Sequence, residues 1–291
     1  MHVPTGLRRA VAVVCATALA SSPVLLAPAT TAGASGAATT AAPAAMPHIT
    51  AKATKRGINV KGTAGLRAGR VHLTVKGPAT VEFVTFDAGY SSDDFVSDVN
   101  KCAEKCNVKA LRRAIENTTI IGGTSGGTGT IVFPKAGSYA PFSIGERGAV
   151  VGRSFDVGGP PRTSKAPRVD GSIIAKKGLS WGGASTLPAD GRFEFKNRGN
   201  AGVPHFVQLQ QVVEGTTEDQ VLAALTAGED GPPPPFLEAS MITGTLSPGH
   251  SMTVDYDLPP GHYAVMCFFP DPDMKGMPHA YMGMIKIIHL T

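Results

Sequence analysis

The chain has 291 residues, 42% hydrophobic and 17% charged, with a formal net charge of +5. The charged fraction is below the usual quarter, which excludes a highly charged disordered protein, and no Lys/Arg cluster indicates a nucleic-acid interface. The length suggests two domains, each able to bury its own core, and the 35 glycines and 23 prolines are typical of turn-rich β structure.

The N-terminal residues have the pattern of a secretory signal peptide. Arg8 and Arg9 precede an apolar run over residues 10–20, and small-residue cleavage sites follow, so residues 1–29 are predicted to be the signal. The run is shorter than the ~20 residues of a membrane span. Residues 30–47, rich in Ala, Thr, Gly and Pro, are predicted to form a flexible leader. We expect a secreted or cell-envelope protein, with no stable membrane insertion after signal removal.

The rest of the chain has the pattern of a tandem repeat. Residues 48–157 and 170–291 carry similar signals in the same order, and a Pro/Gly-rich linker, residues 158–169, separates them. For example, EFVTF at residues 82–86 matches HFVQL at residues 205–209. The sequence therefore predicts an all-β fold of two stacked β-sandwich domains, each with one short inserted helix.

The elements of the second segment are the clearer ones. One helix is predicted over Thr217–Ala227, because Thr217 and Gln220 have the spacing of a capping box. Alternating apolar and polar residues predict the strands Arg192–Lys196, His205–Val213, His250–Leu258, His262–Phe269 and Met284–Leu290.

Three cysteines remain once the signal is removed. Cys102 and Cys106 are four residues apart in a polar, helix-like stretch, so a local disulfide between them is plausible. Cys267 is then left without a disulfide partner. An unpaired thiol is unusual in an oxidising compartment, so Cys267 is a candidate functional residue.

Four side chains of the second segment could form one metal site. His205 opens a strand and points inward, Cys267 closes another strand, and His279 and Met284 follow on the next loop and strand. Two imidazoles, a thiolate and a weak axial thioether are the ligand set of a blue-copper centre, which holds both Cu(I) and Cu(II). Taken singly, each residue also fits an ordinary place in a turn or a core.

At these residues the sequence resembles the cupredoxin (type 1 blue copper) family. LSPGHSMTV at residues 246–254 and LPPGHYAVMC at residues 258–267 are similar to the last hairpin before that family's ligand loop. PHAYMGM at residues 278–284 is similar to the Pro-His-x4-Met end of pseudoazurin-like and plastocyanin-like proteins. The resemblance covers residues 190–291 and implies cupredoxin-like Greek-key sandwiches, with one copper ion in the second.

By this resemblance His205, Cys267 and His279 are equatorial ligands and Met284 is axial. The Cys-to-His spacing departs from the family, because eleven residues, 268–278, intervene where the family has only a few. Loop-closure entropy grows slowly with length, so convergence of the ligands is still expected.

The first segment is predicted to be a metal-free copy of the same fold. It carries Glu82 and Ser143 where the second segment has His205 and Cys267. The fold therefore does not require His or Cys at these positions, which favours a function for them in the second segment.

Methionines are dense near the ligand loop, and thioethers select Cu(I). Met274, Met277 and Met282 are therefore candidate additional Cu(I) ligands. Three functions remain: one-electron transfer at a mononuclear copper site, extracellular Cu(I) carriage by Cys, His and Met ligands, and metal-free binding or adhesion. The first two imply a redox or copper-transfer protein as partner.

Common enzyme motifs are missing from the sequence. There is no Gly-x-Ser-x-Gly elbow and no His-Glu-x-x-His, and GGTSGG at residues 122–127 lacks the Lys of a phosphate loop and is predicted to be a flexible loop. The residues around Cys267 lack the His-Cys-His signature of a multicopper oxidase. We expect no catalytic turnover.

Overall fold

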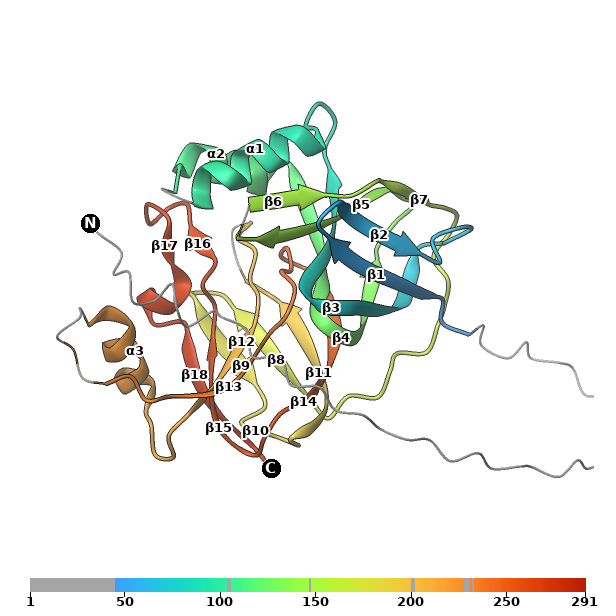
Figure 1. The fold of residues 1–291 in the computed structure, drawn as a ribbon. Coiled ribbons are helices and arrows are strands. Elements are labelled where there is room, and N and C mark those ends of the chain that lie inside the picture. Colours follow the sequence, from blue (N-terminus) through green and yellow to red (C-terminus); the bar gives the residue numbers. More distant parts are fainter. Residues whose placement is uncertain (1–44, 104–105, 147, 200–201, 228–230, 232) are drawn as a thin grey trace, which may run out of the picture.

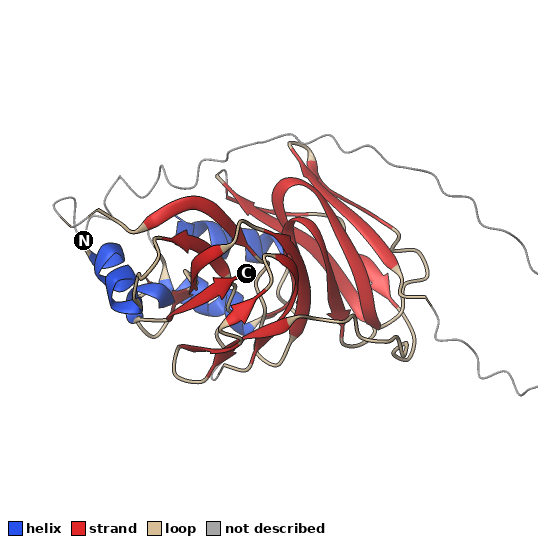
Figure 2. Ribbon diagram, turned by 90° about the horizontal axis from the view of Figure 1, so that it is seen from below, coloured by secondary structure: helices blue, strands red, loops and turns tan. Residues whose placement is uncertain are grey.

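The computed structural model describes residues 45–103, 106–146, 148–199, 202–227, 231 and 233–291. The predicted signal peptide and most of the leader lie outside these residues. Strands form most of the described chain, in sandwich-like sheets, and the helices lie at the periphery of the strand-rich body, two at the top and one at the lower left in Figure 1 (Figures 1 and 2). Within the described ranges, every helix is too short or too polar to cross a bilayer.

The first half of the chain contains a strand-rich body and two helices. Its strands are β1 (His48–Thr54), β2 (Gly57–Lys61), β3 (Gly69–Phe86), β4 (Thr118–Phe133), β5 (Gly137–Gly145), β6 (Gly148–Val151) and β7 (Phe155–Val157). Its helices are α1 (Ser92–Ala103) and α2 (Val108–Glu116). The prediction of one helix in this half is corrected, because Asn107 starts a second helix by accepting a hydrogen bond from the amide of Ala110.

The second half holds the remaining elements. Its strands are β8 (Gly171–Lys176), β9 (Ser180–Gly183), β10 (Thr186–Leu187), β11 (Asp190–Asn197), β12 (Gln208–Val212), β13 (Phe236–Ile242), β14 (Ser251–Asp257), β15 (Gly261–Met266), β16 (Pro270–Asp271), β17 (Met277–Pro278) and β18 (Ile285–Leu290). Helix α3 (Glu218–Thr226) and the short 3-10 helix η2 (His279–Met282) complete it. The predicted cap is confirmed, because Thr217 and Gln220 form both hydrogen bonds of a capping box.

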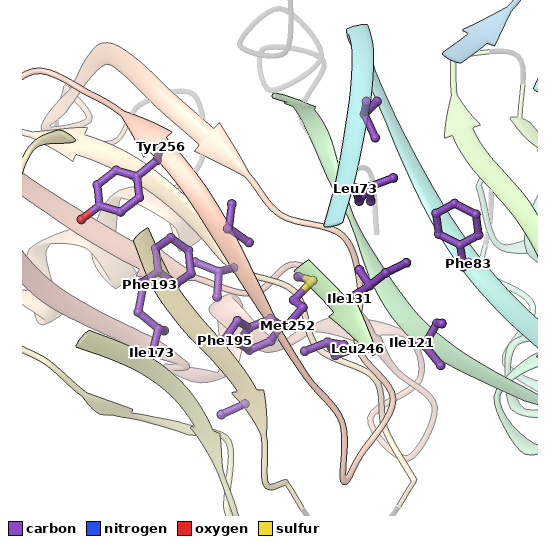
Figure 3. Packing of buried hydrophobic residues seen from close by; sticks show 14 of the residues in the cluster. Leu73, Phe83, Ile121, Ile131, Ile173, Phe193, Phe195, Leu246, Met252 and Tyr256 are labelled. Carbon is purple, nitrogen blue, oxygen red and sulfur yellow. The ribbon is translucent and has the colours of Figure 1, made fainter. Parts of the chain in front are cut away.

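The two halves share one sheet. The large sheet has the order β2-β1-β3-β4-β14-β11-β8-β9, and β4 of the first half pairs antiparallel with β14 of the second. A smaller sheet, in the order β10-β18-β15-β12-β13, belongs wholly to the second half. The buried apolar core runs without a break from Leu73 and Phe83 in β3 to Phe193 and Phe195 in β11 (Figure 3). Both halves therefore contribute to one continuous core.

The glycine-rich residues 122–127 lie inside β4, so the prediction of a flexible loop there is wrong. A Cβ atom on Gly123 would lie 2.1 Å from the carbonyl oxygen of Val81 in β3. A Cβ on Gly129 would lie 2.4 Å from the carbonyl oxygen of Thr253 in β14. The backbones of β3 and β14 thus approach β4 so closely that only glycine fits at these positions. The flexible-loop prediction treats the glycines as turn residues and so misses this role.

A connecting segment, residues 243–247, links β3 of the first half to the backbone of His205, just before β12. The carboxylate of Glu82, buried in β3, accepts a hydrogen bond of 2.6 Å from the amide of Thr245. The next residue, Leu246, forms an isolated antiparallel bridge with His205. The position matched to His205 in the first half thus supports the backbone that pairs with His205.

Replacing Glu82 with Gln should flatten the pH dependence of stability. Burial raises the pKa of Glu82 from 4.5 to about 7, so the folded protein retains a proton that the unfolded chain loses. Its stabilising contribution is fully present below pH 4.5 and is lost as the pH rises to about 7, a change on the order of 3 kcal/mol in the free energy of unfolding. Gln keeps an oxygen for Thr245 and removes this loss.

Urea unfolding of both proteins at several values between pH 4 and 8 measures the difference. The exposed Glu238→Gln variant serves as the control and should follow the wild type. Parallel pH curves for the wild type and Glu82→Gln would contradict the prediction.

Candidate metal centre

His205 is fixed by its backbone just before β12. Its amide and carbonyl exchange hydrogen bonds of 3.0 and 2.8 Å with Leu246, and the side-chain amide of Asn197 donates to the same Leu246 carbonyl at 2.8 Å. His205 is 2% exposed, and Val207 and Leu209, on the same face, are fully buried. The inward direction predicted from the alternation is therefore what the structure shows.

Cys267 follows the last residue of β15 and is fully buried as a free thiol. It continues the buried face that Tyr263 and Val265 form on this strand. The backbone amides of Phe206 and Phe269 lie near its sulfur and partly offset the rise in its pKa that burial causes. Main-chain amides therefore lie near the thiol both from the segment before β12 and from the loop after β15.

His279 reaches the same point because the long insertion folds into a hairpin. Strands β16 and β17 pair antiparallel, Pro270 opposite Pro278 and Asp271 opposite Met277. Beyond the base of this hairpin, the amide of His279 donates to the carbonyl of Phe269 at 3.1 Å. The hairpin thus brings the backbone of His279 into contact with that of Phe269, although residues 270–278 lie between them in sequence.

Three donor atoms converge at this point. The Sγ atom of Cys267 lies 3.6 Å from Nδ1 of His205 and 3.5 Å from Nδ1 of His279, and one donor atom from each of the three residues lies within 4.8 Å of the other two. An ion bonded at about 2.0–2.3 Å to each, with bond angles near 110–120°, would separate its ligand atoms by roughly 3.4–3.8 Å. The spacing of the donor set therefore fits a single metal ion.

Burial sets the protonation of the three groups. It lowers the pKa of His205 to about 3, with a further contribution from neighbouring His279, and lowers the pKa of His279 to about 4. It raises the pKa of the Cys267 thiol to about 12. At neutral pH both imidazoles are already in the uncharged form that binds metals, whereas the thiol must release its proton.

The predicted methionines occupy different environments. Met284 is fully buried in the core cluster that includes Cys267, and its amide donates to the carbonyl of His279 at 3.0 Å. Met274 and Met277 are 49% and 44% exposed on the hairpin, and Met282 is partly buried. The structure therefore buries Met284 in the same large core as Cys267 and leaves Met274 and Met277 on the surface.

The other predicted positions lie apart from this group. Cys102 and Cys106 are joined by a disulfide bond at the end of α1. In the first half, Glu82 is buried and Ser143 lies in β5, neither beside a His or Cys ligand set. Among the described residues, His205, Cys267 and His279 are the one group of three or more His, Cys, Asp or Glu with the spacing of a metal site.

Two functional neighbours were missed by the sequence analysis. Trp181 in β9 has its ring centroid 6.5 Å from that of His205, and its indole N–H donates to the carbonyl of Met284 at 3.0 Å. Asp271 places Oδ2 3.8 Å from Nε2 of His279. The four-residue strand of Trp181 carries no clear alternation, but a buried acid between Cys267 and His279 could have been suspected from its position.

No family model and no curated protein matches the chain. Among solved structures, it is similar to auracyanin B, with 26% identity over 41% of this chain and 86% of that one, and a TM-score of 0.28. Reduced auracyanin from the photosynthetic bacterium Roseiflexus castenholzii is 23% identical over 41% and 94% of the two chains, with a TM-score of 0.27. A multicopper oxidase is 12% identical over 84% and 88%, with a TM-score of 0.25.

These similarities correct one expectation. Several of the similar structures are enzymes, namely multicopper oxidases and a copper-containing nitrite reductase from Thermus scotoductus, the latter 12% identical with a TM-score of 0.22. The exclusion of catalytic turnover from missing motifs is therefore withdrawn. Absence of a short linear signature is weak evidence, because catalytic geometry is assembled by the fold from distant residues.

Trp181, the single tryptophan of the chain, should report metal binding. Because its ring lies beside His205, paramagnetic Cu(II) at the cluster should quench its fluorescence, and the titration should break at one equivalent. Closed-shell Zn(II) serves as the control and should bind without comparable quenching. Quenching that grows without a break, or that is unchanged in Cys267→Ser, would place the copper elsewhere.

Proposed function

We propose that this chain is a copper-binding protein that transfers single electrons at a mononuclear site. His205, Cys267 and His279 would hold the ion, and Met284 would be the weak axial ligand. The observation that carries the proposal is the convergence of two buried imidazole Nδ1 atoms on one buried thiol, at 3.5 and 3.6 Å. This donor set matches the cupredoxin resemblance of residues 190–291.

The chemistry of the donors favours copper and electron transfer. A soft thiolate together with borderline imidazoles binds both Cu(I) and Cu(II), so the ion can exchange one electron without exchanging ligands. A structural zinc site, by contrast, prefers four strong ligands, and here the fourth candidate is a weak thioether. The donor set therefore suits a redox ion better than a structural one.

Rigid support of the ligands favours the same function. His205 is paired with Leu246 through two backbone hydrogen bonds, and the carbonyl of Cys267 accepts from the amide of Ala280 at 2.7 Å. Because the backbone fixes all three ligands, little rearrangement is required between the two oxidation states. The amides of Phe206 and Phe269, which lower the pKa of the thiol, would also stabilise the thiolate and tune the reduction potential.

The location and the partner are parts of the same proposal. The arginines and apolar run at residues 8–20 favour secretion or export to the cell envelope. The disulfide between Cys102 and Cys106 supports an oxidising compartment. We propose another protein as electron donor or acceptor, because a fully buried ligand cluster exchanges electrons through the protein surface that covers it.

Reconstitution with Cu(II) tests the proposal. The wild type should bind one equivalent and show an intense visible absorption from thiolate-to-copper charge transfer, which a mild reductant bleaches and reoxidation restores. Cys267→Ser should abolish the colour, because an alkoxide ligand lacks this transition. Met274→Leu, at an exposed hairpin position, is the matched control and should keep it.

Other outcomes would overturn the proposal in distinct ways. Tight Cu(I) binding without colour, weakened in a combined Met274→Leu and Met277→Leu variant, would favour copper carriage. Exclusive binding of Zn(II) would indicate a structural site, and no metal after reconstitution would favour a metal-free scaffold.

A further inference from the structure

The second ring nitrogen of His279 is buried without a partner. Nδ1 faces the sulfur of Cys267, and Nε2 lacks a hydrogen-bond partner among the described residues although the side chain is fully buried. A histidine that binds a metal through Nδ1 carries its proton on Nε2, and that N–H needs an acceptor. The carboxylate of Asp271, with Oδ2 3.8 Å from Nε2, lies on the side of the ring where this acceptor is required.

The other oxygen of Asp271 is already engaged. Oδ1 accepts hydrogen bonds from the backbone amides of Asp273 at 2.7 Å and Met274 at 3.3 Å, which closes the turn at the tip of the hairpin. Asp271 is 7% exposed, so water has little access to it. One oxygen therefore anchors the carboxylate to the hairpin, and the other is left facing the ring of His279.

The first half of the chain holds the tip of this hairpin. Arg112 in α2 donates from Nη2 to Oδ1 of Asp273 at 2.8 Å and to the carbonyl of Pro272 at 3.3 Å. Gly276 packs so closely on the disulfide that a Cβ atom there would lie 2.7 Å from Sγ of Cys106. Figure 1 shows β16 and β17 beside α2. The turn that carries Asp271 is thus fixed from outside by the first half.

We infer that Asp271 is a positioning residue for His279, and that the first half of the chain keeps it in place through Arg112. The inference rests on the proposed metal site. With its carboxylate oxygen as acceptor, Asp271 selects the imidazole tautomer that has the proton on Nε2 and leaves Nδ1 free to bind the ion. The long insertion between Cys267 and His279 then has two roles. It supplies the Asp271 carboxylate as acceptor, and its hairpin brings Cys267 and His279 together.

Asp271→Asn separates this role from a purely structural one. Asn keeps an oxygen for the turn amides, so the hairpin should form as in the wild type. Its NH2 group would then face Nε2 and favour the opposite tautomer, with the proton on Nδ1, where the ion must bind. Asp156→Asn, at an exposed position of β7, is the matched control.

Two measurements test the expected change in the tautomer of His279. Nitrogen NMR of the metal-free proteins should show the Nε2–H tautomer of His279 in the wild type and Asp156→Asn, and its loss in Asp271→Asn. Competition against a chelator should show copper affinity lowered roughly 10–100-fold in Asp271→Asn. Arg112→Ala should lower the affinity less, because the turn keeps its own hydrogen bonds.

The outcomes distinguish the inference from the proposed function. If Asp271→Asn keeps the tautomer and the affinity of Asp156→Asn, Asp271 only closes the turn and the inference is wrong. If the wild type binds no copper, the proposed function fails, and the tautomer of the metal-free protein still decides the role of Asp271. Equal thermal unfolding temperatures of the two metal-free variants show that a loss of affinity does not come from misfolding.

Discussion

The candidate site depends on the backbone closure at the base of the β16–β17 hairpin. Two hydrogen bonds, from His279 to the carbonyl of Phe269 and from Ala280 to the carbonyl of Cys267, hold the two ends of the insertion together. The entropic cost of closing a loop rises only slowly with its length, and the pairing of β16 with β17 offsets that cost. Without this closure, Cys267 and His279 would belong to separate parts of the chain, and His205 alone would define no site.

Burial determines what the closed site can do. The core that surrounds Cys267 keeps the thiol protonated and both imidazoles neutral in the metal-free protein. The site thus avoids the cost of isolated buried charges, and metal binding introduces the thiolate and the cation together. The amides of Phe206 and Phe269 then lie where the negative charge on sulfur develops. The same burial that keeps the three donors uncharged therefore requires the thiolate and a cation to form the site together.

The sequence predicts the site's parts better than its assembly. Alternation along the chain places His205 and Cys267 on inward faces, and the capping box defines the start of α3, because both signals are local. The hairpin within residues 268–278 is not predictable in this way, since its strands have two residues each. The glycines of β4 reflect contacts with β3 and β14, which are distant in sequence. Nonlocal contacts therefore account for what the sequence leaves out.

Both histidines of the candidate site are supported from the first half of the chain. For His205 the route runs from the buried carboxylate of Glu82 to the amide of Thr245, whose neighbour Leu246 pairs with the histidine. For His279 it runs from Arg112 to the hairpin tip. Helix α2, which the one-helix prediction omits, carries that arginine and begins just after the disulfide that packs on the same tip. The first half, whose described residues hold no such His/Cys cluster, thus contributes by contacting from two sides the backbone that carries the candidate site of the second half.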